Sequence, residues 1–393
     1  MTNNTNKEFY IVDFTASRKY FHQYPLIMGI SNFLIKKGYI PKILLPVVAD
    51  RVEIEHASES VNFILDSGHS SFRYKPLRHL IRRILLITTN GRYSGSSIKK
   101  LLRRKYISSS IKYFREIDPN KSIHVIFPTL DPLSLELAVQ LSKNTKMESY
   151  FFYFRIIGIE SRGILSSNYE LDTLLKLVKI YPKNIKIGIE TVGYKFYLEN
   201  LGFDSSIIFW SPWPCLENFD KNKSKNEKFT IGFLGCAKRR KGFDNIPNIL
   251  SSLKAEGVNF DILIQGANYP WLEYDETKKK IMDFGFEFLP SDLDLADLQE
   301  YINSCDVMIL PYDTNSYSKN GSGVFYHACD SSVPTLTATG VGFAVEIANF
   351  NLGLTYKSFD EIPDLVKKIQ LMKFDFKYYN LERNEATDQF LLR

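Results

Sequence analysis

Four adjacent basic side chains follow a predicted strand near the start of the second half of the chain. Residues 230–242 read TIGFLGCAKRRKG, a strand followed by a glycine, a basic turn and the start of a helix. Gly235 allows the backbone to approach a ligand closely, because glycine has no side chain. The cations are Lys238, Arg239, Arg240 and Lys241. Positive potential at the end of a strand suits a diphosphate, and a solvated basic turn is the alternative.

A second segment, residues 305–347, combines several features of a ligand-binding sheet edge. It contains a strand that ends in Pro311, a variable loop, a short helix that begins at Ser322 and Gly323, and a further strand after Pro334. Ligands of open α/β sheets bind beyond the carboxyl ends of the strands, and free N–H groups at a helix N-terminus bind phosphate. This segment therefore predicts a phosphate-binding pocket at the sheet edge.

The order of these parts resembles the donor-binding core of GT-B glycosyltransferases, especially the large retaining family called GT4. The motifs KG at 241–242, QGAN at 265–268 and GVG at 340–342 add to the resemblance, which covers the C-terminal part of the chain. It implies an α/β fold with two Rossmann-like domains facing each other across a cleft, and a nucleotide diphosphate sugar bound by the second domain. The donor-binding residues that we expect are Gly235, Arg239, Lys241, Asn268, Tyr312, Lys319, Ser322, Gly323, Val324 and His327.

Three positions depart from the pattern of that family. Its members carry a Glu-x7-Glu pair around the short helix, the first glutamate near the transferred sugar and the second holding the ribose. The matching residues here are Lys319 and His327, and Cys236 stands where the family often has a first-loop arginine. Lys319 can neutralise diphosphate charge but cannot accept a hydrogen bond from a sugar hydroxyl. His327 can bond a ribose hydroxyl through either ring nitrogen, and a merely packed histidine is the alternative.

The acceptor site and a general base are expected from the N-terminal half. Asp131 follows a strand and precedes a helix, so it is predicted at the cleft, where a carboxylate can remove the acceptor proton. The alternative is that Asp131 only caps the helix that begins near Pro132. Other polar residues follow further strands of this half. The candidate acceptor-binding residues are Thr15, Arg18, Glu160 and Arg162.

Alternating strand and helix patterns must position these residues. From residue 229 onward, β-branched or aromatic runs alternate with amphipathic stretches, which predicts βαβ units in a parallel sheet. Strands are expected there at 230–234, 261–265, 286–289, 307–310, 335–337 and 352–355, and helices at 243–256, 272–284, 295–304, 323–330 and 359–371. In the N-terminal half, strands are expected at 9–13, 40–45, 62–65, 124–127, 150–154 and 186–189.

Residues 211–228 interrupt this rhythm, because two prolines precede a charged, Asn-rich run. We therefore expect an N-terminal acceptor-binding domain at 1–210, a linker at 211–228 and a nucleotide-sugar-binding domain at 229–373. Residues 374–393 are expected to form a C-terminal helix that can pack back on the first domain. A length of 393 residues and a hydrophobic content of 44% suit two such domains.

The net charge of +6 is concentrated in one segment. Residues 67–115 contain 13 Lys or Arg and no Asp or Glu. Within residues 73–115, apolar side chains fall on one predicted helical face and arginines crowd another, a pattern that suits an anionic membrane surface. A packed helix with a solvated cationic face is the alternative. Nucleic acid is not expected as a partner, because no RNA-binding motif accompanies the charge.

The apolar runs, the N-terminal residues and the cysteines restrict the class of protein further. The apolar runs are too short to span a bilayer and the N-terminus carries no secretory signal, so we expect a cytosolic protein, peripheral at the inner face of the cell membrane. Four separated cysteines predict reduced thiols, and without a His/Cys cluster we expect no metal and no cofactor besides the nucleotide sugar. The resemblance, together with the basic segment, thus implies a metal-independent glycosyltransferase that acts on a glycan or glycolipid acceptor in surface polysaccharide synthesis. A non-catalytic GT-B subunit and a nucleotide-sugar epimerase are the alternatives.

Overall fold

The computed structural model describes most of the chain. The described residues are 7–13, 23–45, 62–65, 107–108, 110–118, 120–144, 147–156, 169–215, 228–267, 273–291 and 293–393. Five predicted site residues lie outside these ranges, namely Thr15, Arg18, Glu160, Arg162 and Asn268. Residues 73–106 of the basic segment and 216–227 of the expected linker also lie outside them.

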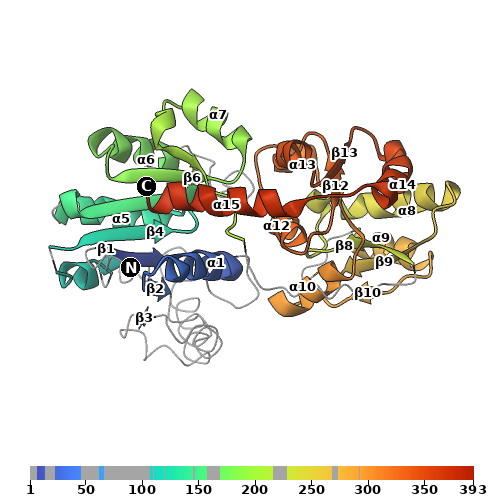
Figure 1. Cartoon of the computed structure of the whole chain (residues 1–393), viewed down its shortest axis with the longest axis horizontal. Helices are drawn as coiled ribbons and strands as arrows, with labels where there is room; N and C mark the ends of the chain where they lie inside the picture. Colours follow the sequence, from blue (N-terminus) through green and yellow to red (C-terminus); the bar gives the residue numbers. More distant parts are fainter. Residues whose placement is uncertain are drawn as a thin grey trace, which may run out of the picture. The chain divides into compact units, whose positions relative to one another are not determined.

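Seven strands form the first sheet, in the order β3-β2-β1-β4-β5-β6-β7 (Figure 1). They are β1 (Lys7–Val12), β2 (Lys42–Leu45), β3 (Asn62–Leu65), β4 (Ser122–Phe127), β5 (Tyr150–Ile156), β6 (Ile185–Ile189) and β7 (Ile208–Trp210). All neighbouring pairs from β3 to β5 are parallel. Helices in this part include α1 (Gln23–Lys36), α5 (Pro132–Asn144), α6 (Tyr169–Ile180) and α7 (Val192–Asn200). Strands β1 and β4 are buried over most of their length, as in parallel sheets covered by helices.

Six parallel strands form the second sheet, in the order β10-β9-β8-β11-β12-β13. They are β8 (Phe229–Phe233), β9 (Phe260–Gln265), β10 (Phe288–Leu289), β11 (Val307–Leu310), β12 (Thr335–Ala338) and β13 (Gly353–Tyr356). The helices are α8 (Ile246–Ala255), α9 (Tyr274–Met282), α10 (Leu295–Asn303), α11 (Thr314–Tyr317), α12 (Gly323–Asp330), α13 (Ala344–Phe350), α14 (Ile362–Leu371) and α15 (Phe376–Leu391). This doubly wound order confirms the predicted Rossmann-like domain, and it reverses between β8 and β11, where ligands of such sheets bind.

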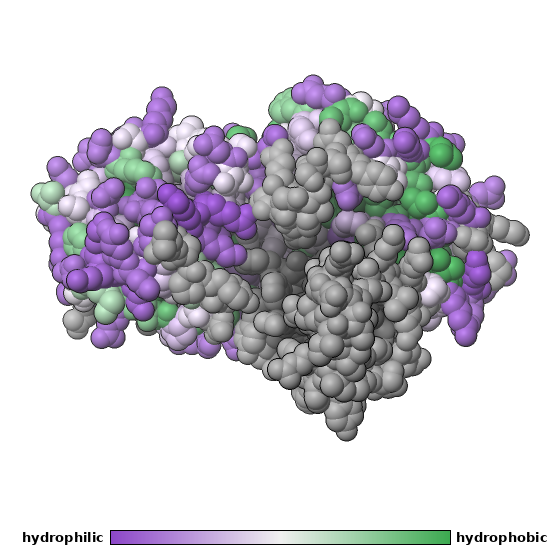
Figure 2. Space-filling model, turned by 180° about the vertical axis from the view of Figure 1, so that it is seen from behind, coloured by the Kyte–Doolittle hydropathy of each residue, from purple (hydrophilic) through white to green (hydrophobic). Residues whose placement is uncertain are grey.

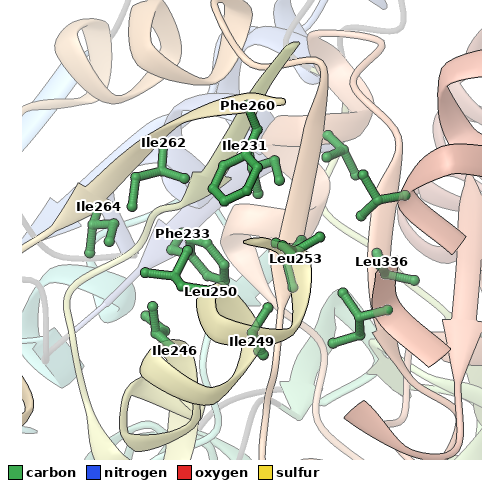
Figure 3. Packing of buried hydrophobic residues seen from close by; sticks show 14 of the residues in the cluster. Ile231, Phe233, Ile246, Ile249, Leu250, Leu253, Phe260, Ile262, Ile264 and Leu336 are labelled. Carbon is green, nitrogen blue, oxygen red and sulfur yellow. The ribbon is translucent and has the colours of Figure 1, made fainter. Parts of the chain in front are cut away.

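The core of the second sheet explains why residues 229–265 fold as they do. Ile249, Leu250 and Leu253 recur at helical spacing in α8 and are fully buried. They pack against Ile231 of β8 and Ile262 of β9, which face the same side of the sheet (Figure 3). Full burial of each such side chain stabilises the fold by about 1.5–3 kcal/mol. This packing holds the carboxyl end of β8, and therefore the basic turn that follows it, in a fixed place.

Two compact units divide the chain. The first comprises Met1–Ile156 and Leu165–Ile187, and the second comprises Ile157–Ile164 and Gly188–Arg393. The division falls inside β6, earlier in the chain than the linker expected at 211–228, so β7 and α7 belong to the unit that contains the second sheet.

Helix α15 is anchored inside the second unit. It lies beside α12 and α13 (Figure 1), and the fully buried guanidinium of Arg383 pairs with Asp330 at 2.7 Å. Arg383 also donates from Nε to the carbonyl of Trp213 at 2.8 Å. The rings of Phe390 and Phe209 pack near the end of the helix, 6.2 Å apart. The tail is therefore helical, as its sequence predicts, and contacts residues that the sequence assigned to the first domain.

The surface is mainly hydrophilic on the described face in Figure 2, where hydrophobic residues appear singly or in small groups. Large exposed hydrophobic side chains include Leu371, Ile40 and Ile180, which lie on separate elements. In the ranges that the structure describes, no helix is both long and apolar enough to cross a bilayer.

Candidate functional site

The turn after β8 is tied to β9 through one side chain. The N–H groups of Gly235 and Cys236 both donate to Oε1 of Gln265 at 2.7 Å. Gln265 in turn donates from Nε2 to the carbonyl of Ser291 at 3.0 Å. Gly235 has φ +92°, a backbone conformation that favours glycine. These two amides are occupied within the protein, so the positive potential of the turn comes mainly from its side chains.

The basic side chains of the turn point in different directions. Lys238 and Lys241 line a pocket together with Gly235, Gln265 and Tyr312. Lys241 donates from Nζ to the carbonyl of Gly235 at 3.0 Å and lies 5.7 Å from the ring centre of Tyr312. Burial lowers the pKa of Lys238, and the neighbouring charge of Lys241 lowers it further. Both lysines therefore line one pocket, whose other lining residues are mostly apolar, and their positive charge suits an anionic ligand there.

Arg239 and Arg240 lie outside that pocket lining. The Arg239 side chain is 72% exposed and pairs with Asp244 at 3.1 Å. The Arg240 guanidinium lies over the ring of Tyr317, 5.7 Å from its centre. The exposure of Arg239 favours a solvated side chain over the donor contact expected from the sequence, whereas Lys238, which that choice omitted, lies in the pocket lining.

Gly242 joins the basic turn to the end of β11. Its φ is +74°, and a Cβ atom at this position would lie 1.7 Å from the carbonyl oxygen of Pro311. Any other residue would clash with the backbone there. The close approach brings the turn beside Tyr312, whose buried hydroxyl lies 3.2 Å from Oγ of Ser322 and whose pKa burial raises to about 12.

The N-terminus of α12 packs against the basic turn. Ser322 caps the helix, because its Oγ accepts from the N–H of Phe325 at 3.4 Å. A Cβ atom on Gly235 would lie 2.4 Å from Cγ2 of Val324, so the basic turn lies directly against the first turn of α12. The N–H groups at the start of a helix attract anions. The predicted residues Gly235, Lys241, Tyr312, Ser322 and Val324 are thus brought together.

Lys319 lies in the loop before α12 and contacts the start of α7. Its Nζ sits 4.2 Å from the ring centre of Tyr197, within the range of a cation–π contact. Its carbonyl accepts a hydrogen bond from Oγ1 of Thr191. The diphosphate contact predicted for Lys319 stays a prediction, and the observed neighbour of its ammonium group is an aromatic ring.

His327 is buried on the inner side of α12. Only 4% of it is exposed, and its ring meets the edge of Trp213 with centroids 5.7 Å apart. Within the described residues its Nδ1 has no hydrogen-bond partner. Burial, and then the charge of Arg383, lowers the pKa of His327 to about 4, so the ring is neutral at pH 7. This geometry favours the packed alternative over the ribose contact.

Asp131 makes the hydrogen bonds of a helix cap. One carboxylate oxygen accepts from the N–H groups of Leu133 at 2.7 Å and Ser134 at 3.3 Å, and the other accepts from the Ser134 hydroxyl. These contacts are those of the capping alternative at the start of α5. This geometry favours the capping alternative over the general-base role.

Glu190, which sequence analysis did not select, is a buried carboxylate beside the α12 loop. It directly follows β6, and Asp131 likewise lies after the carboxyl end of a strand, β4. It is 3% exposed, and it accepts from Nε1 of Trp213 at 2.9 Å and from the N–H of Gly321 at 3.2 Å. A search for acidic residues at every strand end would have found it.

Comparisons with known proteins identify the fold. No protein-family model and no curated protein sequence matches the chain. Among solved structures, the sucrose-phosphate synthase of Thermosynechococcus elongatus matches with a TM-score of 0.63 and 12% identity over 98% of this chain and 95% of that one. Anabaena HepE in complex with UDP matches with a TM-score of 0.61 and 12% identity over 98% and 95%.

A third match is S. aureus TarM, solved as a variant in complex with fondaparinux, alpha-GlcNAc-glycerol and UDP. Its TM-score is 0.60 at 9% identity over 98% of this chain and 97% of that one. The similarity runs through both halves of the chain, and it bears out the predicted architecture. The chain has the two-domain α/β fold of the GT-B glycosyltransferases.

Proposed function

We propose that the protein is a glycosyltransferase that takes a sugar from a nucleoside diphosphate donor and transfers it to a glycan or glycolipid. The observation that carries this proposal is that Lys238 and Lys241 line one pocket, and that Gly235 in the same lining packs against Val324 in the first turn of α12. The pocket is at the carboxyl end of β8, beside the point where the strand order reverses. Two cations and a helix N-terminus are the groups that bind a diphosphate.

The same groups have a role in the reaction. When the bond between sugar and diphosphate breaks, negative charge grows on the leaving diphosphate. Lys238 and Lys241 lower the energy of that charge if they stay close to it during the transition state. We propose that these side chains take the place of a metal ion, and that no cofactor besides the nucleotide sugar is needed.

The acceptor is proposed on the chemistry of the structural neighbours. One of them is the lipopolysaccharide outer core galactosyltransferase WaaB, and the TarM complex contains saccharide molecules as well as UDP. A glycan or lipid-linked acceptor in surface polysaccharide synthesis is consistent with those ligands. Contact of residues 73–115 with an anionic membrane surface belongs to the same proposal, because a lipid-linked acceptor lies at such a surface.

The test begins with the purified chain and calorimetric titration of UDP, GDP and dTDP. Binding of at least one of them is expected, and failure of all three to bind would refute the proposal. The sugar nucleotides of the base that binds are then incubated with glycan and glycolipid acceptors. Saturable transfer excludes a non-catalytic subunit. Donor incubated alone should keep its sugar, and an epimer formed without acceptor would show an epimerase instead.

A further inference from the structure

The loop before α12, residues 318–322, is held by a segment that lies far from it in the sequence. Oγ1 of Thr191 donates to the carbonyl of Lys319, and the hydroxyl of Tyr194 donates to Oδ1 of Asn320 at 3.1 Å. The ring of Tyr197 lies under the Lys319 ammonium. Helix α7 and its N-cap Thr191 therefore contact consecutive residues of the loop, all within the second compact unit.

Among these contacts to the loop, the one made by Glu190 lies nearest to the start of α12. Its Oε2 accepts from the N–H of Gly321, the residue that immediately precedes the cap Ser322. Its Oε1 accepts from the indole of Trp213, and its carbonyl accepts from Nε1 of Trp210 at 3.2 Å and from the hydroxyl of Tyr326 at 3.3 Å. The carboxylate thus joins β6, the segment after β7 and the α12 loop at one buried point.

Two glycines show how closely the loop packs against Glu190 and Trp213. A Cβ atom on Gly321 would lie 2.7 Å from Oε2 of Glu190, and one on Gly323 would lie 3.0 Å from the Trp213 ring. The backbone of the loop and of the first helical turn therefore lies directly on Glu190 and Trp213. We therefore expect a displacement of either side chain to change the position of the N–H groups at the start of α12.

The Glu190 carboxylate is an unusual group for a residue that only fills a core. Two neutral N–H groups donate to the Glu190 carboxylate, one from a backbone and one from an indole. Removing a carboxylate from water is costly, and an apolar side chain of similar size often stabilises a core as well or better. The hydrogen bonds to the Gly321 amide and to the Trp213 indole explain why a carboxylate occupies this position.

We propose that Glu190 is a positioning residue of the donor site: it orients the Gly321 amide and Trp213, and through them sets where the N-terminus of α12 meets the donor. The inference rests on the proposed function, because the donor is the ligand whose binding the loop position would control. Glu190 itself is not assigned a contact with the donor. Its effect is expected in donor binding and not in acceptor binding.

The test compares Glu190→Gln with a matched control, Glu346→Gln. Glu346 is also buried and also accepts a hydrogen bond, from Tyr379, but it lies on α13. Burial raises its pKa to about 8 and the charge of Glu190 acts in the same direction, so this control tests the loss of a buried carboxyl group and not the loss of a charge. A glutamine at 190 can accept from only one of the two N–H groups, because its NH2 group faces the other donor. In Glu190→Gln we expect the donor KM to rise about tenfold, with the acceptor KM unchanged. In Glu346→Gln both KM values should stay near wild type.

A second measurement does not need activity. Hydrogen exchange of the peptide that covers residues 318–325 should be at least several times faster in Glu190→Gln than in wild type, and unchanged in Glu346→Gln. A wild-type donor KM in Glu190→Gln, or unchanged exchange of that peptide, would overturn the proposal. Equal effects of the two variants on donor KM would also overturn it, because a general loss of packing then explains both. Wild-type protein that binds no nucleotide refutes the proposed function, and the exchange measurement still decides whether Glu190 holds the loop.

Discussion

Replacing Lys241 by methionine is the sharpest test of the phosphate pocket. The substitution keeps an apolar stem of similar length and removes the ammonium group that donates to the carbonyl of Gly235 at 3.0 Å. An ammonium group has three N–H donors, so Lys241 can keep that bond and still donate to a phosphate. The loss of one charge-assisted hydrogen bond to phosphate costs about 1.5–3 kcal/mol. Since about 1.4 kcal/mol corresponds to a tenfold change in a dissociation constant, we expect the Kd for UDP to rise about 10- to 100-fold.

The matched control is Arg239→Met in the same turn. The Arg239 side chain is 72% exposed and pairs with Asp244, so its removal costs at most an exposed ion pair, about 0.2–1 kcal/mol. We expect its Kd for UDP to stay within about fivefold of wild type. The two variants remove the same charge from neighbouring positions, and they differ in whether the cation lines the pocket.

Calorimetry with UDP and with uridine separates phosphate contacts from base contacts. Lys241→Met should weaken UDP binding and leave uridine binding unchanged, because uridine carries no phosphate. Two results would refute the reasoning: wild-type UDP affinity in Lys241→Met, or an equal loss for UDP and uridine. The first removes Lys241 from the site, and the second shows a collapsed turn and not a lost phosphate contact.

Three further predictions concern turnover, stability and pH. Asp131→Asn should keep turnover near wild type in a transfer assay, since the carboxylate is directed at the α5 backbone and asparagine also caps helices; a fall of about 10²-fold or more would restore it as a general base. Asp330→Ala should lower the free energy of unfolding in urea by about 3–5 kcal/mol, because Arg383 is left buried without its carboxylate; a loss below about 1 kcal/mol would contradict this. Burial raises the pKa of Glu346 from 4.5 to about 8, so the folded state keeps a proton that the unfolded state loses. Its contribution to stability is therefore present below pH 4.5 and is lost as the pH rises to about 8, and Glu346→Gln should flatten that part of the urea profile.

Much of the second sheet could be predicted from the sequence. The strand at 307–310 and the helix at 323–330 are found with the expected bounds. The bounds of β8, β9 and β12 each differ by no more than one residue from those expected from the sequence. These segments have strong apolar patterns bounded by glycine or polar residues, which local sequence reports well. Strand β7 has only three residues and α13 follows a glycine-rich loop, so neither has a pattern long enough to recognise.

The candidate site also has some features that the sequence predicts and others that it does not. The basic turn, its glycines and the cap Ser322 lie within short segments whose turn chemistry and spacing are visible in the sequence. Their meeting is also predictable, because carboxyl ends of neighbouring parallel strands share one edge of a sheet. The sequence could not show that Lys238 faces the pocket while Arg239 faces solvent, since both lie in one basic run and only the backbone path of the turn separates them.

By itself, then, the sequence determined the α/β class, the doubly wound second sheet and the location of the basic turn, because these depend on local periodicity and on the few residues that turns accept. Only the tertiary structure decided what surrounds the loop before α12. Glu190 and Gly321 are 131 residues apart, and Thr191 and Lys319 are 128 apart. No local pattern records such a pair. The contact exists because β6 and the α12 loop are brought together by the packing of the whole second unit, which also buries His327 and turns Lys319 toward Tyr197.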